Sequence, residues 1–293
     1  MSVKPSKTNA LVSRILTFSC VDGPGNRLVI FLQGCNFDCI TCHNPHTINH
    51  CTDCGDCVAP CPADALSFSA EGKVVWDAAK CTHCDLCIDV CPHKSNPKIV
   101  SYSLDDMLAL VRQHHFFLNG ITVSGGEATL QLPFIIELFK AVKADPALSH
   151  LTCFIDSNGS LSRAGWERVA PYLDGAMIDL KSWQSETHRW LIGRDKHRVI
   201  DTIDLLAEMG KLHEVRLLHI PGKSDLDTEV DAVGDYLNTL PKDVKIRLNA
   251  FQHHGVMGEA LTWEKCSESE MNRFHDLLLS KINRPMQLPT IYT

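Results

Sequence analysis

The sequence predicts an α/β fold built from six strand–helix units, with a cysteine-rich segment inserted after the first strand. Short apolar runs alternate along the chain with longer stretches in which apolar residues recur every three or four positions. This is the pattern of parallel strands joined by amphipathic helices. Residues 48–98 break the alternation and hold eight of the fourteen cysteines. Repeated units of this kind form either a barrel or a doubly wound sheet, and the alternation alone leaves both open.

The positions of these runs give the expected elements and domains. Strands are expected at residues 27–33, 120–124, 151–156, 175–180, 214–220 and 245–250. Helices are expected at residues 104–115, 132–143, 162–172, 198–208, 228–240 and 269–281. The cysteine-rich segment lies between the first and second strands. We therefore expect one domain from residues 1–47 and 99–293, and an inserted domain from residues 48–98.

Polar and glycine residues cluster where the expected strands end. Examples are Gln33-Gly34-Cys35, Ser124-Gly125-Gly126-Glu127, Asp156-Ser157-Asn158-Gly159, Asp179-Leu180-Lys181 and Asn249-Ala250-Phe251-Gln252. The carboxyl ends of parallel strands lie on one face, and in βα barrels that face carries the active site. The alternative is a set of solvated loop ends, because Asp, Asn and Gly are also ordinary helix caps and turn formers.

Composition excludes several function classes. The 293 residues contain 28 Lys and Arg against 35 Asp and Glu, a net charge of −7, which does not suit a nucleic-acid binder. No apolar run is long enough for a membrane span, and residues 1–14 hold no continuous apolar segment typical of a signal peptide. We therefore expect a cytoplasmic protein without a membrane partner. In that compartment, fourteen cysteines indicate metal binding rather than disulfides.

Eight cysteines form two runs of identical spacing, Cys-x2-Cys-x2-Cys-x3-Cys-Pro. Bacterial ferredoxins hold [4Fe–4S] clusters with this run, and the fourth cysteine of each run ligates the other cluster. The expected auxiliary ligand sets are Cys51, Cys54, Cys57 and Cys91 for one cluster, and Cys81, Cys84, Cys87 and Cys61 for the other. A pair of zinc sites is the alternative, although zinc modules usually pair two short knuckles that lie far apart.

Cys35, Cys39 and Cys42 have a different spacing and no fourth partner once the eight others are assigned. Three ligands leave one iron of a cluster open, as a catalytic site does. The spacing Cys-x3-Cys-x2-Cys resembles the radical S-adenosylmethionine (SAM) superfamily. That resemblance implies that the amino and carboxylate groups of SAM chelate the open iron. It also implies that the six units form an incomplete (β/α)6 barrel, with the ferredoxin-like domain as an insertion.

The sequence Gly125-Gly126-Glu127 follows the second expected strand. Glycines let a backbone approach a ligand closely, and a carboxylate accepts hydrogen bonds from an ammonium group. The motif resembles the superfamily's Gly-Gly-Glu, which implies that it binds the methionyl amine of SAM. Ala128 stands where relatives usually have proline. A plain turn is the alternative interpretation of these residues.

A second group of residues resembles the glycyl radical enzyme activating enzymes, the family of the pyruvate formate-lyase activator. The group comprises Asp156, Ser157 and Asn158 together with Met177, Asp179 and Lys181. The resemblance implies that Asp156, Ser157, Asp179 and the backbone of Met177 form a monovalent cation site beside SAM, and that Lys181 reaches the SAM carboxylate. Two carboxylates facing an anionic ligand need a cation between them. A solvated strand edge or an interior ion pair is the alternative.

Further residues match the same family. Two segments match sequence motifs of the family: Val21-Asp22-Gly23-Pro24-Gly25-Asn26-Arg27 and Cys42-His43-Asn44-Pro45. Arg216 lies where the family has an arginine near SAM. The resemblance therefore implies that SAM is bound by Gly125, Gly126, Glu127, Asp156, Ser157, Asn158, Asp179, Lys181, Arg216 and His43. Thr41 and Gln252 depart from the family, since relatives usually have an aromatic residue and a histidine there.

The resemblance implies an activating enzyme that reductively cleaves SAM to a 5′-deoxyadenosyl radical. This radical abstracts a hydrogen atom from a glycine of a partner glycyl radical enzyme. The implied cofactors are three [4Fe–4S] clusters, SAM and a monovalent cation, and the implied electron donor is a low-potential flavodoxin or ferredoxin. The insert is expected to conduct electrons under anaerobic conditions, with partner docking or stabilisation as alternatives. Other functions left open are a radical SAM enzyme that modifies a peptide or small molecule, and an electron-transfer protein.

Overall fold

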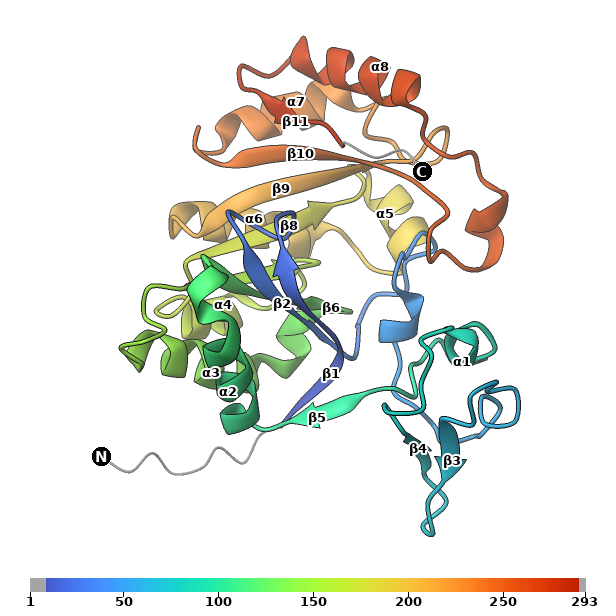
Figure 1. Cartoon of the computed structure of the whole chain (residues 1–293). Helices are drawn as coiled ribbons and strands as arrows, with labels where there is room; N and C mark the ends of the chain where they lie inside the picture. Colours follow the sequence, from blue (N-terminus) through green and yellow to red (C-terminus); the bar gives the residue numbers. More distant parts are fainter. Residues whose placement is uncertain (1–8, 290–293) are drawn as a thin grey trace.

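A single open sheet of nine strands, in the order β11-β10-β9-β8-β7-β6-β2-β1-β5, forms the framework of the computed structural model, which describes residues 9–289 (Figure 1). Seven neighbouring strands are parallel. They are the six expected strands, β2 (Arg27–Leu32), β6 (Gly120–Gly125), β7 (Thr152–Ser157), β8 (Gly175–Leu180), β9 (Leu212–His219) and β10 (Lys245–Ala250), and the short edge strand β11 (Met286–Gln287). They follow one another in chain order without reversal. In a doubly wound sheet the strand order reverses once along the chain. The order found here does not reverse, as in a βα barrel, but the two edge strands do not pair, so the barrel is incomplete.

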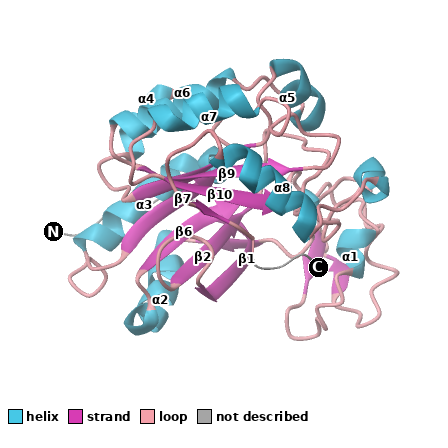
Figure 2. Cartoon of the chain, turned by 90° about the horizontal axis from the view of Figure 1, so that it is seen from above, coloured by secondary structure: helices cyan, strands magenta, loops and turns pink. Residues whose placement is uncertain are grey.

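The expected helices are present within a few residues of their predicted ends. They are α2 (Leu104–His114), α3 (Leu132–Ala144), α4 (Arg163–Val169), α6 (His197–Glu208), α7 (Val230–Thr239) and α8 (Glu268–Leu279). Helix α2 begins at a capping box, in which Ser103 and Asp106 exchange hydrogen bonds. Helices α4, α6 and α7 lie along one side of the sheet (Figure 2). No helix among residues 9–289 is long and apolar enough to cross a membrane.

Other elements were not predicted. They are β1 (Ala10–Ser19), β5 (Val100–Tyr102), β11 (Met286–Gln287), α5 (Ser185–Ile192) and the 3₁₀ helices η1 (Pro45–Thr47), η2 (His115–Phe117), η3 (Ala128–Gln131) and η4 (Gly258–Thr262). Strand β1 pairs antiparallel with β2, and its register shifts at two places. Such shifts break the regular alternation that marks a strand in a sequence.

The cysteine-rich segment lies apart from the large sheet (Figure 1). It contains the hairpin β3 (Leu66–Phe68) and β4 (Val74–Trp76) and the short helix α1 (Leu86–Asp89). Between residues 49 and 103, the buried apolar side chains are those of Cys57, Ala65 and Leu66. A core of this size does not stabilise a domain by itself, so the segment needs additional links such as bound metal.

The junction between β2 and β6 requires glycine. Gly125 has φ +124°, and a Cβ there would lie 2.2 Å from the Leu32 carbonyl oxygen. A Cβ on Gly126 would lie 2.4 Å from the carbonyl oxygen of Gly34. Both contacts are far inside van der Waals distance and involve backbone, which cannot move aside without breaking the strand pairing. The two glycines therefore hold the residues after β2 against the end of β6.

We expect Gly125→Ala to lower the free energy of unfolding by about 3 kcal/mol or more, because backbone strain and a clash with Leu32 add together. Urea denaturation measures this change. Gly193→Ala is the matched control, because Gly193 also has positive φ (+79°) but has open space around its missing Cβ. The control should lose about 1 kcal/mol. Equal losses in the two variants would show that the close contact with β2 does not matter.

Candidate active site

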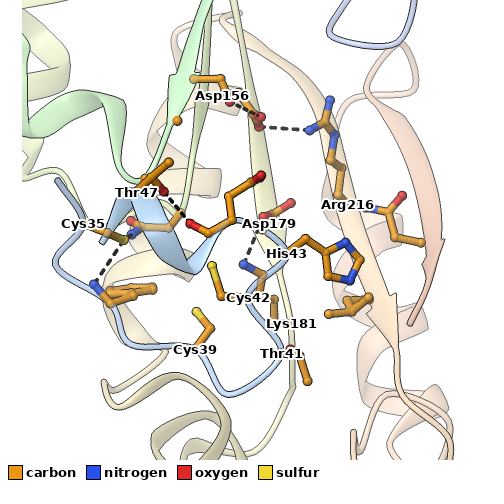
Figure 3. Close-up of a pocket in the computed structure, with 18 of the residues that line it drawn as sticks. Cys35, Cys39, Thr41, Cys42, His43, Thr47, Asp156, Asp179, Lys181 and Arg216 are labelled. Atoms are coloured by element: carbon orange, nitrogen blue, oxygen red, sulfur yellow. Dashed lines mark hydrogen bonds and ion pairs between the residues drawn. The ribbon is translucent and has the colours of Figure 1, made fainter. Parts of the chain in front are cut away.

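A cavity of about 580 Å³ lies at the carboxyl ends of the parallel strands (Figure 3). This volume suits a small-molecule ligand. The residues that line it include twelve of the predicted site residues: Cys35, Cys39, Cys42, His43, Gly125, Gly126, Asp156, Ser157, Asn158, Asp179, Lys181 and Arg216. They come from segments far apart in the sequence, and the shared direction of β2, β6, β7, β8 and β9 brings them together.

The three cysteines lie on the loop that follows β2, and backbone hydrogen bonds fix this loop on two sides. The Cys35 N–H, near the start of the loop, donates to the carbonyl of Ile48, near its end (2.9 Å). This hydrogen bond closes the loop. The Ile40 N–H donates to the Leu191 carbonyl at the end of α5 (2.9 Å). Helix α5, which the sequence did not reveal, therefore supports the cysteine loop. This support fixes Cys39, next to Ile40, in the cavity wall.

The thiols of this loop can serve as metal ligands. Burial raises the pKa of the Cys35 thiol to about 12, and it also raises the pKa values of Cys39 and Cys42. A metal must therefore displace the three thiol protons when it binds. Two buried atoms in the cavity wall, His43 Nε2 and Gln252 Oε1, have no hydrogen-bond partner among residues 9–289. Free thiols beside unpaired polar atoms fit a site for a cluster and a polar ligand.

The position of Glu127 differs from the expectation that its carboxylate accepts from an ammonium group. Its side chain is fully buried outside the cavity lining. Its carboxylate accepts hydrogen bonds from the Thr129 N–H (3.0 Å) and hydroxyl (2.5 Å), the Ser157 hydroxyl (2.9 Å) and the Asn158 N–H (2.7 Å). Four donors satisfy the carboxylate. In this structure Glu127 ties β6 to β7, and the Gly125 and Gly126 backbone faces the cavity.

Asp156 and Arg216 form the most buried ion pair of the cavity. Arg216 Nη1 lies 3.0 Å from Asp156 Oδ1, and Arg216 Nε lies 2.6 Å from Glu214 Oε1. Burial raises the pKa of Asp156, and the negative charge of Asp179 raises it further. Arg216 and the Ser124 hydroxyl lower the same pKa. Burial alone would lower the pKa of Arg216, but Asp156, Asp179 and Glu214 raise it above its ordinary value. The arginine is therefore charged at any physiological pH.

Lys181 lies between Asp179 and the cysteine loop. Its ammonium is 3.2 Å from Asp179 Oδ2 (Figure 3). Burial would lower the pKa of Lys181, but the nearby Cys39 and Asp179 reverse this effect and raise it. The lysine is thus a permanent positive charge beside the thiols. It can bind a carboxylate of a ligand that enters the cavity.

The three side chains expected to hold a monovalent cation already have partners in the protein. Asp156 pairs with Arg216, and Asp179 with Lys181. Ser157 donates to Glu127. The cation site stays a prediction. Sequence reasoning missed Glu214, although its position two residues before Arg216 places both side chains on one face of β9.

The eight remaining predicted ligands line two small cavities in the inserted segment. Cys51, Cys54, Cys57 and Cys91 line one cavity, and Cys61, Cys81, Cys84 and Cys87 line the other. This grouping follows the crossed pairing that the ferredoxin spacing implies. Among residues 9–289, no three His, Cys, Asp or Glu side chains are grouped closely enough to hold a single metal ion.

Comparisons with known proteins identify the class of this protein. The family model of the radical SAM superfamily matches residues 29–232, and the chain belongs to that superfamily. The chain is 27% identical over 307 residues to the 4-hydroxyphenylacetate decarboxylase activating enzyme of Clostridium scatologenes, covering 96% of this chain and 95% of that protein. It is 27% identical over 259 residues to the isethionate sulfite-lyase activating enzyme of Desulfovibrio desulfuricans, covering 80% of this chain and 81% of that protein.

The fold is shared with more distant members of the superfamily. The solved structure of a radical SAM methyltransferase from Sphaerobacter thermophilus aligns with a TM-score of 0.55 at 12% identity. The alignment covers 91% of this chain and 67% of that chain. At this identity the likeness shows the α/β radical SAM fold alone.

We expect Arg216→Leu to destabilise the protein by about 3 kcal/mol or more, because Asp156 and Glu214 lose their positive partner in a buried site. Thermal or urea unfolding measures this loss. Arg189→Leu is the control, because Arg189 pairs with Asp195 on the surface and its loss should cost less than about 1 kcal/mol. If Arg216→Leu were as stable as this control, the buried ion pairs would not support the cavity.

Proposed function

We propose that this radical SAM protein is an activating enzyme that generates the radical on the glycine of a partner glycyl radical enzyme. The observation that carries the proposal is the cavity itself. Its lining contains three cysteines and no fourth one, together with two positive side chains, Lys181 and Arg216, at the ends of parallel strands. The relatives that align along most of the chain are named as activating enzymes.

Cys35, Cys39 and Cys42 would hold the cluster of the active site. When bound there, a [4Fe–4S] cluster would supply the open iron that the amino and carboxylate groups of SAM chelate, and the electron that cleaves the sulfonium. Lys181 would hold the SAM carboxylate, because its ammonium faces the same cavity as the three thiols. The Gly125 and Gly126 backbone would lie along the methionyl part of SAM, since neither residue has a Cβ in the way.

The surrounding protein would keep the reactive site rigid and dry. Glu127 joins the ends of β6 and β7 through Thr129, Ser157 and Asn158. Arg216 donates hydrogen bonds to Asp156, Met177 and Glu214, and these bonds fix the three side chains relative to one another. A primary alkyl radical abstracts hydrogen from almost any C–H or S–H bond within reach, so the cavity must place the target glycine before cleavage. No protein acid or base is required for hydrogen-atom abstraction.

The inserted domain would hold two auxiliary [4Fe–4S] clusters, one in each cysteine cavity, and would pass electrons from a reduced flavodoxin or ferredoxin to the site. Its attachment supports this role. Lys94, three residues after Cys91, pairs with Asp38 of the active-site loop at 2.7 Å. Asn49 lies two residues before Cys51, and its side-chain amide donates to the His93 carbonyl. The residue before Asn49, Ile48, accepts a hydrogen bond from the Cys35 N–H. Both contacts link the Cys51–Cys91 set to the active-site loop.

The partner is a finer part of the proposal. The combination of Gly125-Gly126-Glu127-Ala128 with Arg247-Leu248-Asn249-Ala250-Phe251 resembles YjjW, for which the glycyl radical protein YjjI is the proposed partner. We therefore take YjjI as the partner to test first. The relatives named above activate two different enzymes, so the class of partner is broader than one protein.

We expect Cys39→Ala to abolish both 5′-deoxyadenosine formation and the glycyl radical, because two thiols do not hold the active-site cluster. Anaerobic electron paramagnetic resonance (EPR) of the reduced, reconstituted protein with SAM and YjjI detects the radical as a doublet, and chromatography measures 5′-deoxyadenosine. Cys20→Ala is the control, because Cys20 is exposed and lines none of the three cysteine cavities.

The two readouts separate the competing functions. An electron-transfer protein would keep its activity in Cys39→Ala. A radical SAM enzyme with another substrate would form 5′-deoxyadenosine in the wild type with no doublet on any glycyl radical protein tested. Either result would contradict the activating function.

A further inference from the structure

Two buried hydrogen-bond donors in the inserted domain have no partner in the part of the chain that the structure describes. They are the Ser95 hydroxyl and the Trp76 indole N–H. Ser95 is 1% exposed. A buried donor without a partner costs about 1–3 kcal/mol, so folded proteins nearly always provide an acceptor. Two such donors in a segment of about fifty residues therefore require an explanation.

Each donor lies in the wall of a different cysteine cavity. Ser95 lines the cavity of Cys51, Cys54, Cys57 and Cys91. Trp76 lines the cavity of Cys61, Cys81, Cys84 and Cys87. Neither residue belongs to the cysteine runs, so the ferredoxin spacing did not point to them. One unpaired donor in each cavity suggests that the acceptor is whatever fills the cavity.

The backbone holds both donors in place. Ser95 forms a parallel bridge with Asn49, and Asn49 also bonds to the His93 and Lys94 carbonyls. Trp76 pairs with Leu66 in the hairpin of β3 and β4. These pairings fix the backbone from which the two side chains extend. The protein alone therefore places each side chain in the wall of its cavity, before any group binds.

We propose that Ser95 and Trp76 each donate a hydrogen bond to a sulfur of the auxiliary cluster in its own cavity, and that this bond raises the reduction potential of that cluster. The inference rests on the cluster assignment of the proposed function. Reduction adds negative charge to the cluster, so a donor stabilises the reduced form more than the oxidised one. Ser95 and Trp76 are thus positioning and tuning residues, not ligands.

The test is an EPR-monitored redox titration of the reconstituted protein with its three clusters, using dithionite as reductant. We expect Ser95→Ala to lower the potential of one auxiliary signal and Trp76→Phe to lower that of the other. A change of about tenfold in each one-electron equilibrium constant is expected, which is 59 mV for one electron. Ser95→Thr keeps the hydroxyl and should keep the wild-type potential.

Matched controls separate tuning from general perturbation. Ser67→Ala removes an exposed serine of β3, and Trp190→Phe removes a half-exposed tryptophan of α5. Both should leave every potential unchanged. Unchanged potentials in Ser95→Ala and Trp76→Phe, or a shift of the same signal in both, would overturn the proposal. Potentials are read without a partner, so this result is independent of glycyl radical formation, which tests the function.

A measurement on the wild type covers the case in which a variant fails to take up iron. Protein labelled with 15N-tryptophan should show a nitrogen hyperfine coupling to a reduced auxiliary cluster, because Trp76 is the one tryptophan that lines a cysteine cavity among the described residues. Exchange into D2O should add deuteron couplings to both auxiliary clusters. The absence of these couplings would overturn the proposal.

Discussion

The close approach of two backbones, the loop after β2 and the turn after β6, is the constraint on which the site depends. The Glu127 N–H donates to the Gly34 carbonyl, and the Gly126 N–H donates to the Leu32 carbonyl. Only residues without a Cβ fit at this contact. It places the Gly-Gly backbone directly beside the cysteine that follows Gly34. The cavity, the cysteine loop and the ends of β7 to β9 all take their positions from it.

Charge balance is the second requirement of the cavity. Asp156, Glu214 and Asp179 are carboxylates, and Arg216 and Lys181 oppose them. Buried carboxylates without such partners would take up protons, because water no longer stabilises their charge. The pairing also keeps the arginine and lysine in fixed positions. The cavity is therefore electrostatically arranged before a ligand with both an amino and a carboxylate group enters it.

The sequence predicted the parts of the structure that depend on local pattern. The six parallel strands and their helices follow from long periodic segments, and the cysteine sets follow from spacing. Strand β1 was missed because its register shifts break the alternation. Helix α5 was missed because its N-cap residue, Gln184, makes no capping hydrogen bond, whereas the even shorter α4 begins at the capping residue Ser162. The burial of Glu127 depends on Thr129, Ser157 and Asn158 together, and no single segment encodes that contact. Ser95 and Trp76 were found only when the fold placed their unpaired donors in the walls of the two cysteine cavities.

The inserted domain also affects how the chain assembles. It lies within the connection between β2, which ends at Leu32, and β6, which begins at Gly120, although these strands are paired neighbours in the sheet. The entropic cost of closing a loop grows only with the logarithm of its length, so a long connection hardly weakens the pairing. The large sheet has its own hydrophobic core, while the insert buries few apolar side chains. The large sheet can therefore complete its folding while the inserted segment is still unfolded.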